Sequence, residues 1–230
     1  YGFEHHLIKK YECHVIERFP KCVLVSQADI DYLKTITTQH TPLELHANGV
    51  GCLKKLPTHY DNKKICFVGN MRTLQNQDAV LFFVNEIFPR ILKYEPDTIF
   101  YIVGAQPPRT IQQLASNNII VTGFVDDLGE TISDACLTVA PVRVASGIQN
   151  KVLVAMGYGL PVVLTGLIAQ GIPELVNEES ALIRDDAATI AEACLRIMHD
   201  PKLRQKLSEE GHQTVIYHYS WKEKIKGYIV

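Results

Sequence analysis

The feature that most constrains the fold is a regular alternation of apolar and amphipathic segments between residues 65 and 183. The apolar runs ICFVG (65–69), TIFYIVG (98–104) and CLTVAPV (136–142) are continuous, and segments with helical spacing separate them. A strand without alternating polarity buries both of its faces, so the sheet is expected to be parallel and covered by helices on both sides. The sequence therefore predicts a Rossmann-like, doubly wound α/β fold.

The segments before this alternation predict a shorter α/β arrangement. Residues 4–19 repeat apolar positions at helical spacing, residues 21–26 form a short apolar run, and residues 27–36 suit a helix that Ser26 could cap. The segment LELHANGV, residues 43–50, predicts a strand that runs into an Asn-Gly turn.

The remaining segments connect these parts and close the chain. Residues 51–64 are largely polar, contain a proline and predict a linker. Apolar positions at helical spacing predict a helix over residues 78–94, and residues 187–218 suit one or two long helices.

The ends of the predicted strands carry small and polar residues. Ligands of open parallel sheets bind beyond the carboxyl ends of the strands, so these segments are the first places to look for a site. They are Gly69-Asn70, Gly104-Ala105, Gly123 to Val125, Pro141 to Gly147, and Thr165-Gly166.

The turn at Ser146 and Gly147 suits an anion. Glycine lets the backbone approach a ligand closely, and a helix that begins near Ile148 would add the positive end of its dipole. Lys151, one turn further on, could supply a full positive charge, and a diphosphate fits this geometry. In the alternative interpretation, Ser146 caps the helix and nothing binds.

The faces of this helix give Val154 a distinctive place. At about 100° per residue, one face is an apolar stripe that should meet the core, formed by Ile148, Val152, Ala155 and Met156. The opposite face carries Gly147, Asn150 and Val154. Val154 therefore looks out over the crevice, unless the helix is covered on both sides and Val154 belongs to the core.

Two other strand ends are candidates for contact with a ligand. The segment after Gly69 resembles a phosphate loop in layout and contains Arg72, although an exposed arginine without a ligand is an equally good interpretation. Near Gly123, Val125 and Leu128 could enclose a flat ring. The adjacent Asp126-Asp127 pair fits a helix cap better than paired acid–base catalysis.

Composition excludes several classes of function. The formal net charge of −2 gives no argument for nucleic acid. Six cysteines without a CxxC pair, and nine histidines without zinc spacing, predict no metal site and indicate a reducing, cytoplasmic setting. No run approaches the ~18 apolar residues of a membrane span, and no secretory signal opens the chain. The chain begins at Tyr1 within a helical pattern, which leaves open that it is a piece of a longer protein.

Together, these segments resemble group-one glycosyltransferases, which are retaining, nucleotide-sugar-dependent enzymes of the GT-B fold. The resemblance covers residues 65–222, and its most specific part is SGIQNKVL followed by AM and GLPVV. The motifs that carry it, in order, are FVGNM (67–71), YIVGAQPP (101–108), VTGFVDDL (121–128), VAPVRVASGIQNKVLVAM (139–156) and YSW (219–221).

The resemblance implies four parts for this chain. Residues 1–50 would be the last elements of an N-terminal acceptor domain, 51–64 a linker, 65–215 the nucleotide-sugar-binding domain, and 216–230 a C-terminal crossover helix.

It also implies binding roles for individual residues, and it leaves the catalytic residues unknown. The donor diphosphate would be bound by Gly69, Asn70, Arg72, Ser146, Gly147, Ile148 and Lys151. The base and ribose would lie against Gly104, Gly123, Phe124, Val125, Leu128, Asn150 and Val154. Such enzymes need no bound metal or cofactor, because protein dipoles and cations offset the charge of the leaving diphosphate.

The resemblance further implies the partners and location of the protein. The partners would be a nucleotide-sugar and a glycan or lipid-linked acceptor, in the synthesis of a cell-surface polysaccharide. The location would be the cytoplasm or the inner face of the membrane, and a peripheral membrane association through the missing N-terminal domain is left open.

Two departures from the family weigh against full activity. The residue before AM is usually a glutamate that holds the ribose, and here it is Val154; a second frequent glutamate corresponds to Ser146, where small residues also occur. Most of the N-terminal domain is missing as well. A catalytically impaired domain that serves as a scaffold or nucleotide-binding module therefore stays open. A UDP-sugar epimerase and a dehydrogenase are weaker alternatives, because there is neither an acid–base pair nor a GxGxxG motif.

Overall fold

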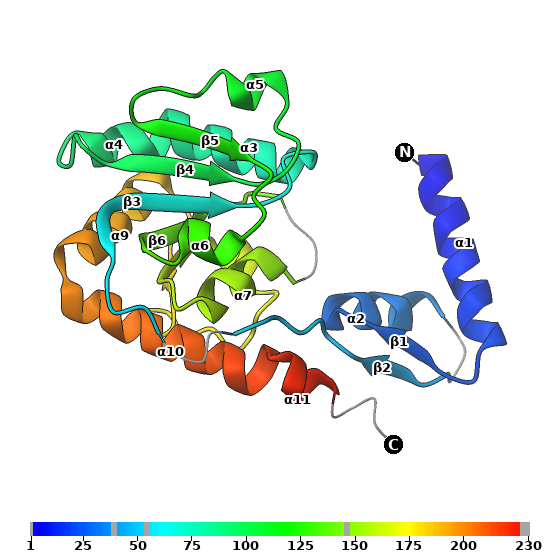
Figure 1. The fold of residues 1–230 in the computed structure, drawn as a ribbon. Coiled ribbons are helices and arrows are strands. Elements are labelled where there is room, and N and C mark those ends of the chain that lie inside the picture. Colours follow the sequence, from blue (N-terminus) through cyan, green and yellow to red (C-terminus); the bar gives the residue numbers. More distant parts are fainter. Residues whose placement is uncertain (1, 38–40, 53–55, 145–147, 226–230) are drawn as a thin grey trace.

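The structure, a computed structural model, describes residues 2–37, 41–52, 56–144 and 148–225. They form a larger lobe, which contains a six-stranded sheet, and a smaller lobe at the N-terminal end of the chain (Figure 1). The strands of the larger sheet are β3 (Asp61–Val68), β4 (Ile99–Val103), β5 (Ile119–Gly123), β6 (Ala135–Ala140), β7 (Val162–Leu164) and β8 (Leu182–Ile183). All are parallel to their neighbours, in the order β5-β4-β3-β6-β7-β8.

Helices cover both faces of this sheet, as the continuous apolar strands predict. One face is covered by α3 (Leu74–Phe82), the π-helical turn η1 (Phe83–Ile87), α4 (Phe88–Leu92), α5 (Arg109–Gln112) and α9 (Ala187–His199). The other is covered by α6 (Leu128–Ile132), α7 (Asn150–Gly157) and α10 (Pro201–Tyr219). The short helix α8 (Gly166–Ala169) follows β7, and α11 (Trp221–Ile225) follows α10. The predicted doubly wound α/β fold is therefore confirmed.

Three aromatic rings pack together where η1 and α4 meet the sheet. The rings of Phe83 and Phe100 lie 4.3 Å apart between centroids, and the ring of Phe88 lies 5.8 Å from each. All three side chains are buried. Aromatic groups at these separations add packing energy beyond the area they bury, so this cluster fixes η1 and α4 against β4.

Helical structure over residues 78–94 is confirmed, but it is interrupted by the π turn η1. Pro89 explains the interruption, because it has no N–H to donate and its ring would collide with the carbonyl of Asn85 in a regular α-helix. A wider turn just before Pro89 removes that collision.

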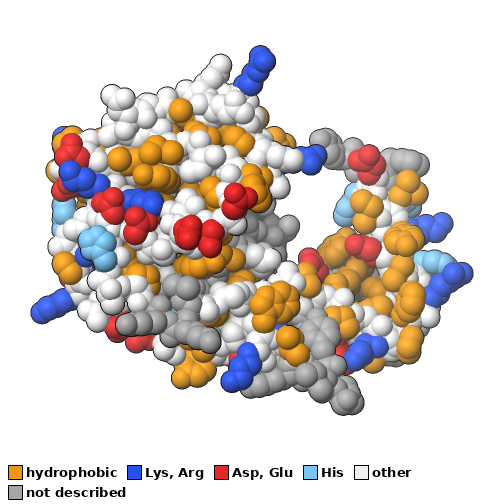
Figure 2. Space-filling view, in the orientation of Figure 1, with side chains coloured by type: hydrophobic (Ala, Val, Ile, Leu, Met, Phe, Trp, Pro, Cys, Tyr) orange, Lys and Arg blue, Asp and Glu red, His pale blue; other side chains and the backbone are white. Residues whose placement is uncertain are grey.

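The smaller lobe consists of two parallel strands and two helices. These are α1 (Gly2–Arg18), β1 (Cys22–Leu24), α2 (Gln27–Ile36) and β2 (Leu43–Leu45). The Oγ of Ser26 accepts a hydrogen bond from the N–H of Asp29 at 3.4 Å, which confirms that Ser26 caps α2. Figure 2 shows hydrophobic side chains gathered over this lobe, and Leu7, Tyr11 and Val23 are about half exposed or more.

The two lobes meet where the chain returns from the end of α10. Val50 and Ser220 form a parallel bridge, and the N–H of Val50 donates to the carbonyl of Tyr219 at 2.8 Å. A turn at Asn48 and Gly49 was expected, but the structure forms none there. Instead, Gly49 lies against Trp221, where an added Cβ would come within 2.7 Å of the indole ring.

The predicted boundaries near this junction shift slightly. Strand β3 begins at Asp61, inside the segment 51–64 that was expected to be a linker. The reason is that the N–H of Asp61 donates to the carbonyl of Asp134 at 2.6 Å, which extends the pairing with β6 toward the start of the strand.

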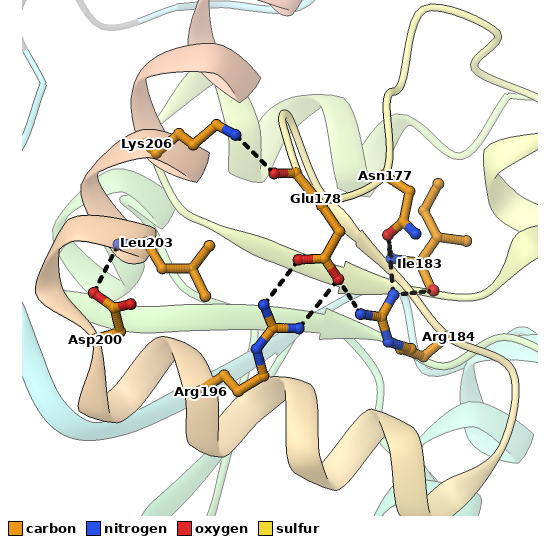
Figure 3. A network of polar contacts seen from close by, with 8 residues as sticks. All are labelled: Asn177, Glu178, Ile183, Arg184, Arg196, Asp200, Leu203 and Lys206. Carbon is orange, nitrogen blue, oxygen red and sulfur yellow. Dashed lines mark hydrogen bonds and ion pairs between the residues drawn. The ribbon is translucent and has the colours of Figure 1, made fainter.

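A cluster of ion pairs and hydrogen bonds joins the β8 edge of the sheet to α9 and α10 (Figure 3). Glu178 lies between Arg184, beside β8, and Arg196 on α9, and its carboxylate accepts hydrogen bonds from both guanidinium groups. Lys206 on α10 donates to the main-chain carbonyl of Glu178 at 3.0 Å. Hydrogen bonds from Arg196, with those from Arg184, lower the pKa of Glu178 to about 2. The cluster also holds Glu178 at a φ of 66°, a conformation that non-glycine residues adopt with strain.

We expect Glu178→Gln to lower the free energy of unfolding by roughly 1 kcal/mol at pH 7, a modest loss because the carboxylate is partly exposed and screened. The pKa of Glu178 is lowered on folding, so its stabilising contribution is complete above about pH 4.5 and is lost as the pH falls toward 2. Urea unfolding at pH 7 and pH 3 should therefore show a smaller difference between variant and wild type at pH 3. Glu210→Gln, at an exposed position on α10, is the control and should change neither value.

An equal difference at both pH values would mean that the charge of Glu178 contributes nothing and that only side-chain shape matters.

Candidate functional site

The strand order reverses at the carboxyl edge of the large sheet, and the region where the segments after β3 and β6 leave the sheet is called the crevice. From β3 the chain moves outward to β4 and β5, and then returns to β6 on the opposite side of β3. The segments that follow β3 and β6 therefore leave the sheet in opposite directions. Figure 1 shows the arrowheads of β3, β4 and β5 pointing toward the side of the smaller lobe. A reversal point of this kind is where open α/β sheets bind their ligands.

Three glycines bring the backbone together at this edge. The N–H of Gly69 donates to the carbonyl of Val103 at 3.0 Å, and the N–H of Gly104 donates to the carbonyl of Gly123 at 3.1 Å. Gly104 has a φ of 151°, and an added Cβ would lie 1.8 Å from the carbonyl oxygen of Gly69. The hydrogen bonds confirm the sequence prediction that Gly69, Gly104 and Gly123 lie at one edge. At position 104, only glycine permits the close approach to Gly69.

The charged centre of the crevice is the ammonium group of Lys151. Lys151 lies in the first turn of α7 and donates a short hydrogen bond to Oδ1 of Asn76, in the first turn of α3. The Nδ2 of Asn76 in turn donates to the carbonyl of Asn70 at 2.9 Å. The Nζ of Lys151 also lies 5.4 Å from the centre of the Phe67 ring. The crevice thus joins the segments that follow β3 and β6 through a single polar chain.

The environment of Lys151 is unfavourable for a positive charge. The ion pairs found among the described residues do not include Lys151. Burial lowers the pKa of its ammonium group to about 8, because the charged form loses contact with water. The contacts described for this ammonium group are the neutral amide of Asn76 and the ring of Phe67, so an anion that enters the crevice would stabilise its charge.

The first helical turn after β6 differs from the predicted one. Helix α7 begins at Asn150 rather than near Ile148, with Gln149 at the cap position. Ser146 and Gly147, predicted to bind an anion, lie outside the described residues. Lys151 is therefore in the first turn of the helix instead of one turn inside it, which places its charge next to the positive end of the helix dipole.

The faces of α7 agree with prediction in part. Val152, Ala155 and Met156 are buried as expected, while Leu153 is fully buried as well. Val154 is half-buried and packs against the edge of the core cluster. The helix is thus covered over a wider arc than the predicted stripe, and Val154 lies at the margin between core and surface.

The other predicted residues differ in their exposure. Arg72 is exposed, and its N–H donates to Oδ1 of Asn70 at 3.0 Å. Beyond β5, Phe124 is 74% exposed, whereas Val125 and Leu128 are half-buried against the core. Asn150 is exposed at the start of α7, and Ile148 is half-buried just before it.

The interpretation of Asp127 as a helix cap is confirmed. Its Oδ1 accepts a hydrogen bond from the N–H of Glu130 at 3.0 Å, at the start of α6.

Sequence reasoning missed two pairs of residues near the crevice. One is Asn76 with its bond to Lys151, and the other is Arg143, which follows β6 and binds Asp78 on α3 through two hydrogen bonds of 3.1 and 2.6 Å. The available signal was the polar run that precedes Asp78. Amide and carboxylate side chains at the start of a helix that follows a strand ending in glycine lie at the carboxyl edge of the sheet.

The described residues were also considered for metal binding and for membrane-spanning helices. No group of three or more His, Cys, Asp or Glu side chains there is arranged to hold a metal ion. None of the helices in that part of the chain has the length and apolar character needed to cross a membrane.

Comparison with known families decides the classification. The family model described as "Glycosyl transferases group 1" matches residues 62–200. The chain belongs to this family. The resemblance found in the sequence is thereby confirmed, and the matched region contains the crevice of this group 1 glycosyl transferase together with Asn76 and Lys151.

Individual relatives of this group 1 glycosyl transferase are distant. A Klebsiella pneumoniae protein, described as an uncharacterized 44.6 kDa protein in the cps region, is 23% identical over 144 residues, which are 56% of this chain and 37% of that protein. TarM of S. aureus has a TM-score of 0.79 at 16% identity, and the match covers 96% of this chain and 45% of TarM. HepE of Anabaena has a TM-score of 0.77 at 11% identity, covering 96% of this chain and 65% of HepE.

These structural likenesses confirm the expected GT-B fold. The chain spans less than two thirds of the length of each of these relatives.

We expect Gly104→Ala to destabilise this glycosyl transferase by about 3–5 kcal/mol, because the added Cβ combines backbone strain with collision against the carbonyl of Gly69. Gly123→Ala is the matched control. Gly123 also has a positive φ, of 71°, but nothing lies within 4 Å of an added Cβ, so its loss should be only about 1–2 kcal/mol. Urea unfolding measures both, and equal losses would contradict the close approach of the two strand ends.

Proposed function

We propose that this chain is the donor-binding part of a retaining glycosyltransferase, which transfers a sugar from a nucleoside diphosphate to a glycan or lipid-linked acceptor. One observation carries the proposal. The ammonium group of Lys151 is buried at the reversal point of the sheet and is met there by the amide of Asn76. A diphosphate has the charge and size to bind at such a point, beside the start of α7.

The same groups would assist the transfer itself. Bond cleavage at the sugar leaves additional negative charge on the departing diphosphate. Lys151, held in place by Asn76, would stabilise that charge without reorganising, which is the main way in which a fixed electrostatic environment lowers a barrier. Ser146, Gly147 and Arg72 would add main-chain N–H groups and a second cation.

A uridine nucleotide is the form of donor that the relatives favour. TarM is described in complex with UDP, and HepE in complex with UDP and glucose. In this chain the base would lie beside Gly104 and Gly123, against the half-buried Val125 and Leu128. Phe124 and Asn150 are exposed at the same edge, where they could contact the base or ribose.

The acceptor side is inferred from the small lobe and the relatives. The exposed apolar surface of α1 and β1 fits a lobe that belongs to a larger acceptor domain. The Klebsiella protein of the cps region supports a role in cell-surface polysaccharide synthesis. The site of action would be the cytoplasm or the inner face of the membrane, with peripheral membrane association through that acceptor domain.

Lys151→Gln should weaken UDP binding by ~10- to 150-fold, because a charge-assisted hydrogen bond worth about 1.5–3 kcal/mol is lost. Glutamine keeps an N–H donor for Asn76, so the variant should remain folded. Calorimetric titration with UDP measures the effect, and Lys202→Gln, at an exposed lysine on α10, is the control.

Binding of UDP should also depend on pH. Because the pKa of Lys151 is lowered to about 8, the ammonium form that attracts the diphosphate is depleted as the pH rises above 8. Wild-type affinity should fall about tenfold between pH 7 and pH 9, whereas the Lys151→Gln variant should show no such change.

Equal affinities for wild type and variant at pH 7, or no binding of UDP and GDP at millimolar concentration, would overturn the proposal.

A second candidate function is a catalytically impaired domain that binds nucleotide or a partner. Val154 favours it, because valine cannot accept a hydrogen bond from the ribose at a position where the family usually has glutamate.

Val154→Glu should then raise UDP affinity by at least ~10-fold, since the side chain lies at the margin between core and surface and a carboxylate there could reach the ribose hydroxyls. The gain should vanish for 2′,3′-dideoxyuridine diphosphate, which lacks those hydroxyls. Val154→Gln is the control for size. A folded Val154→Glu variant with unchanged UDP affinity would show that this position does not face the ribose.

A further inference from the structure

A cavity of the large lobe lies between the segment that precedes β3 and the first half of α10. Its volume is about 580 Å³, within the range of cavities that hold small ligands. The lining includes Leu56, Pro57, Thr58 and Tyr60 from the segment before β3, and Arg204 and Ser208 from α10. Figure 1 shows β3 and α10 both starting on the side of the large lobe that faces away from the smaller lobe. The crevice lies where β3 ends, so this cavity is at the opposite edge of the sheet.

A buried guanidinium group lines the cavity. Arg204 is 9% exposed, and the ion pairs found among the described residues do not include it. Its two described hydrogen bonds both leave from Nη1, to Oδ1 of Asn62 at 2.6 Å and to Sγ of Cys136 at 3.5 Å. Within the described part of the chain, no hydrogen bond leaves Nε or Nη2. These two atoms carry three further N–H donors along one edge of the planar group.

The surroundings hold this guanidinium group in place. Its central carbon lies 5.3 Å from the centre of the Tyr60 ring, a separation at which a cation is attracted to an aromatic ring. The hydroxyls of Tyr60 and Ser208 lie 2.9 Å apart, and both lie within hydrogen-bond distance of the carbonyl of Gly159, at 3.3 and 2.6 Å. A group that is already ordered loses little freedom when a ligand binds, which favours affinity.

The charges of the lining favour an anion of a single charge. Arg204 and Glu209 are the charged side chains among the described lining residues, and Glu209 is exposed at the rim. Arg204 can neutralise a monoanion, whereas a phosphate dianion would keep an uncompensated charge near Glu209. A carboxylate also matches the planar edge of a guanidinium group with two parallel hydrogen bonds.

We propose that this cavity is a second ligand site, which binds a small organic monocarboxylate with an apolar body. The carboxylate accepts hydrogen bonds from Nε and Nη2 of Arg204. The apolar body lies against Leu56, Pro57 and the ring of Tyr60. The site is independent of the proposed donor site, because none of its residues belongs to the crevice.

The test uses two probes of the same shape that differ in charge. The 230-residue chain is titrated with 4-fluorobenzoate and with the neutral 4-fluorobenzamide, and fluorine NMR follows the binding. The benzoate should bind saturably, and about tenfold or more tightly than the amide, because only the benzoate forms charge-assisted hydrogen bonds. Neither an equal concentration of inorganic phosphate nor an excess of UDP should displace it.

Two variants link the binding to the cavity. Arg204→Lys keeps the charge but removes the planar fork, and should weaken 4-fluorobenzoate by about tenfold or more. Arg204 is buried, so the second variant leaves it in place. Thr58→Asp adds a carboxylate at an exposed lining position, and should weaken the benzoate by a similar factor because it competes for the guanidinium group. His59→Asp, at the next exposed residue, which is not among the described lining residues, is the matched control and should bind as wild type does. Thermal unfolding checks that each variant is folded.

The outcomes that would overturn the proposal are specific. Equal binding of benzoate and amide, or no binding of either, would show that the cavity does not select an anion. Displacement of the benzoate by UDP would place the probe in the crevice. Folded Thr58→Asp that binds the benzoate as tightly as His59→Asp would place the probe away from this cavity. The UDP titrations of Lys151→Gln test the donor site separately, so either proposal can fail while the other stands.

Discussion

The site depends on the reversal of the chain between the neighbouring strands β3 and β6 and on the segments that follow them. Both strands are buried on both faces, so each must continue through a helix that covers the sheet. Because the two connections leave in opposite directions, neither α3 nor α7 covers the edge between the two strands. Helices α3 and α7 bring their first turns together at this edge, where Lys151 donates to Asn76. The crevice is thus a consequence of chain topology before any side chain is considered.

The polar chain in that crevice costs stability. The pKa of Lys151 lies below its value in an unfolded chain, so between about pH 8 and pH 10.5 the unfolded chain binds more protons and stability rises with pH. At neutral pH the buried ammonium group therefore opposes folding. Asn76 offsets this in part through one hydrogen bond, and an anionic ligand would offset more. A lysine placed for packing or solubility alone would have no reason to lie there.

The sequence predicted the fold well because its signal is local. Continuous apolar runs ending in glycine located β3 and β4, and a serine before a helical pattern located the cap of α2. The π turn before Pro89 and the start of α7 were missed, since both depend on a hydrogen-bond register that periodicity does not record. The hydrogen bonds between Lys151 and Asn76 and between Tyr219 and Glu174 were missed, because each joins residues that are distant in the sequence.

The return of the chain from α10 links the two lobes to one another. The Val50–Ser220 bridge and the packing of Gly49 on Trp221 fix the segment after α10 against the end of the small lobe. Tyr219, next to that bridge, then reaches Glu174 in the large lobe. The position of the Glu174 carboxylate therefore depends on how the lobes are joined. A shift of one lobe relative to the other would therefore move the Glu174 carboxylate while leaving the Lys151 centre, which lies wholly within the large lobe, unchanged.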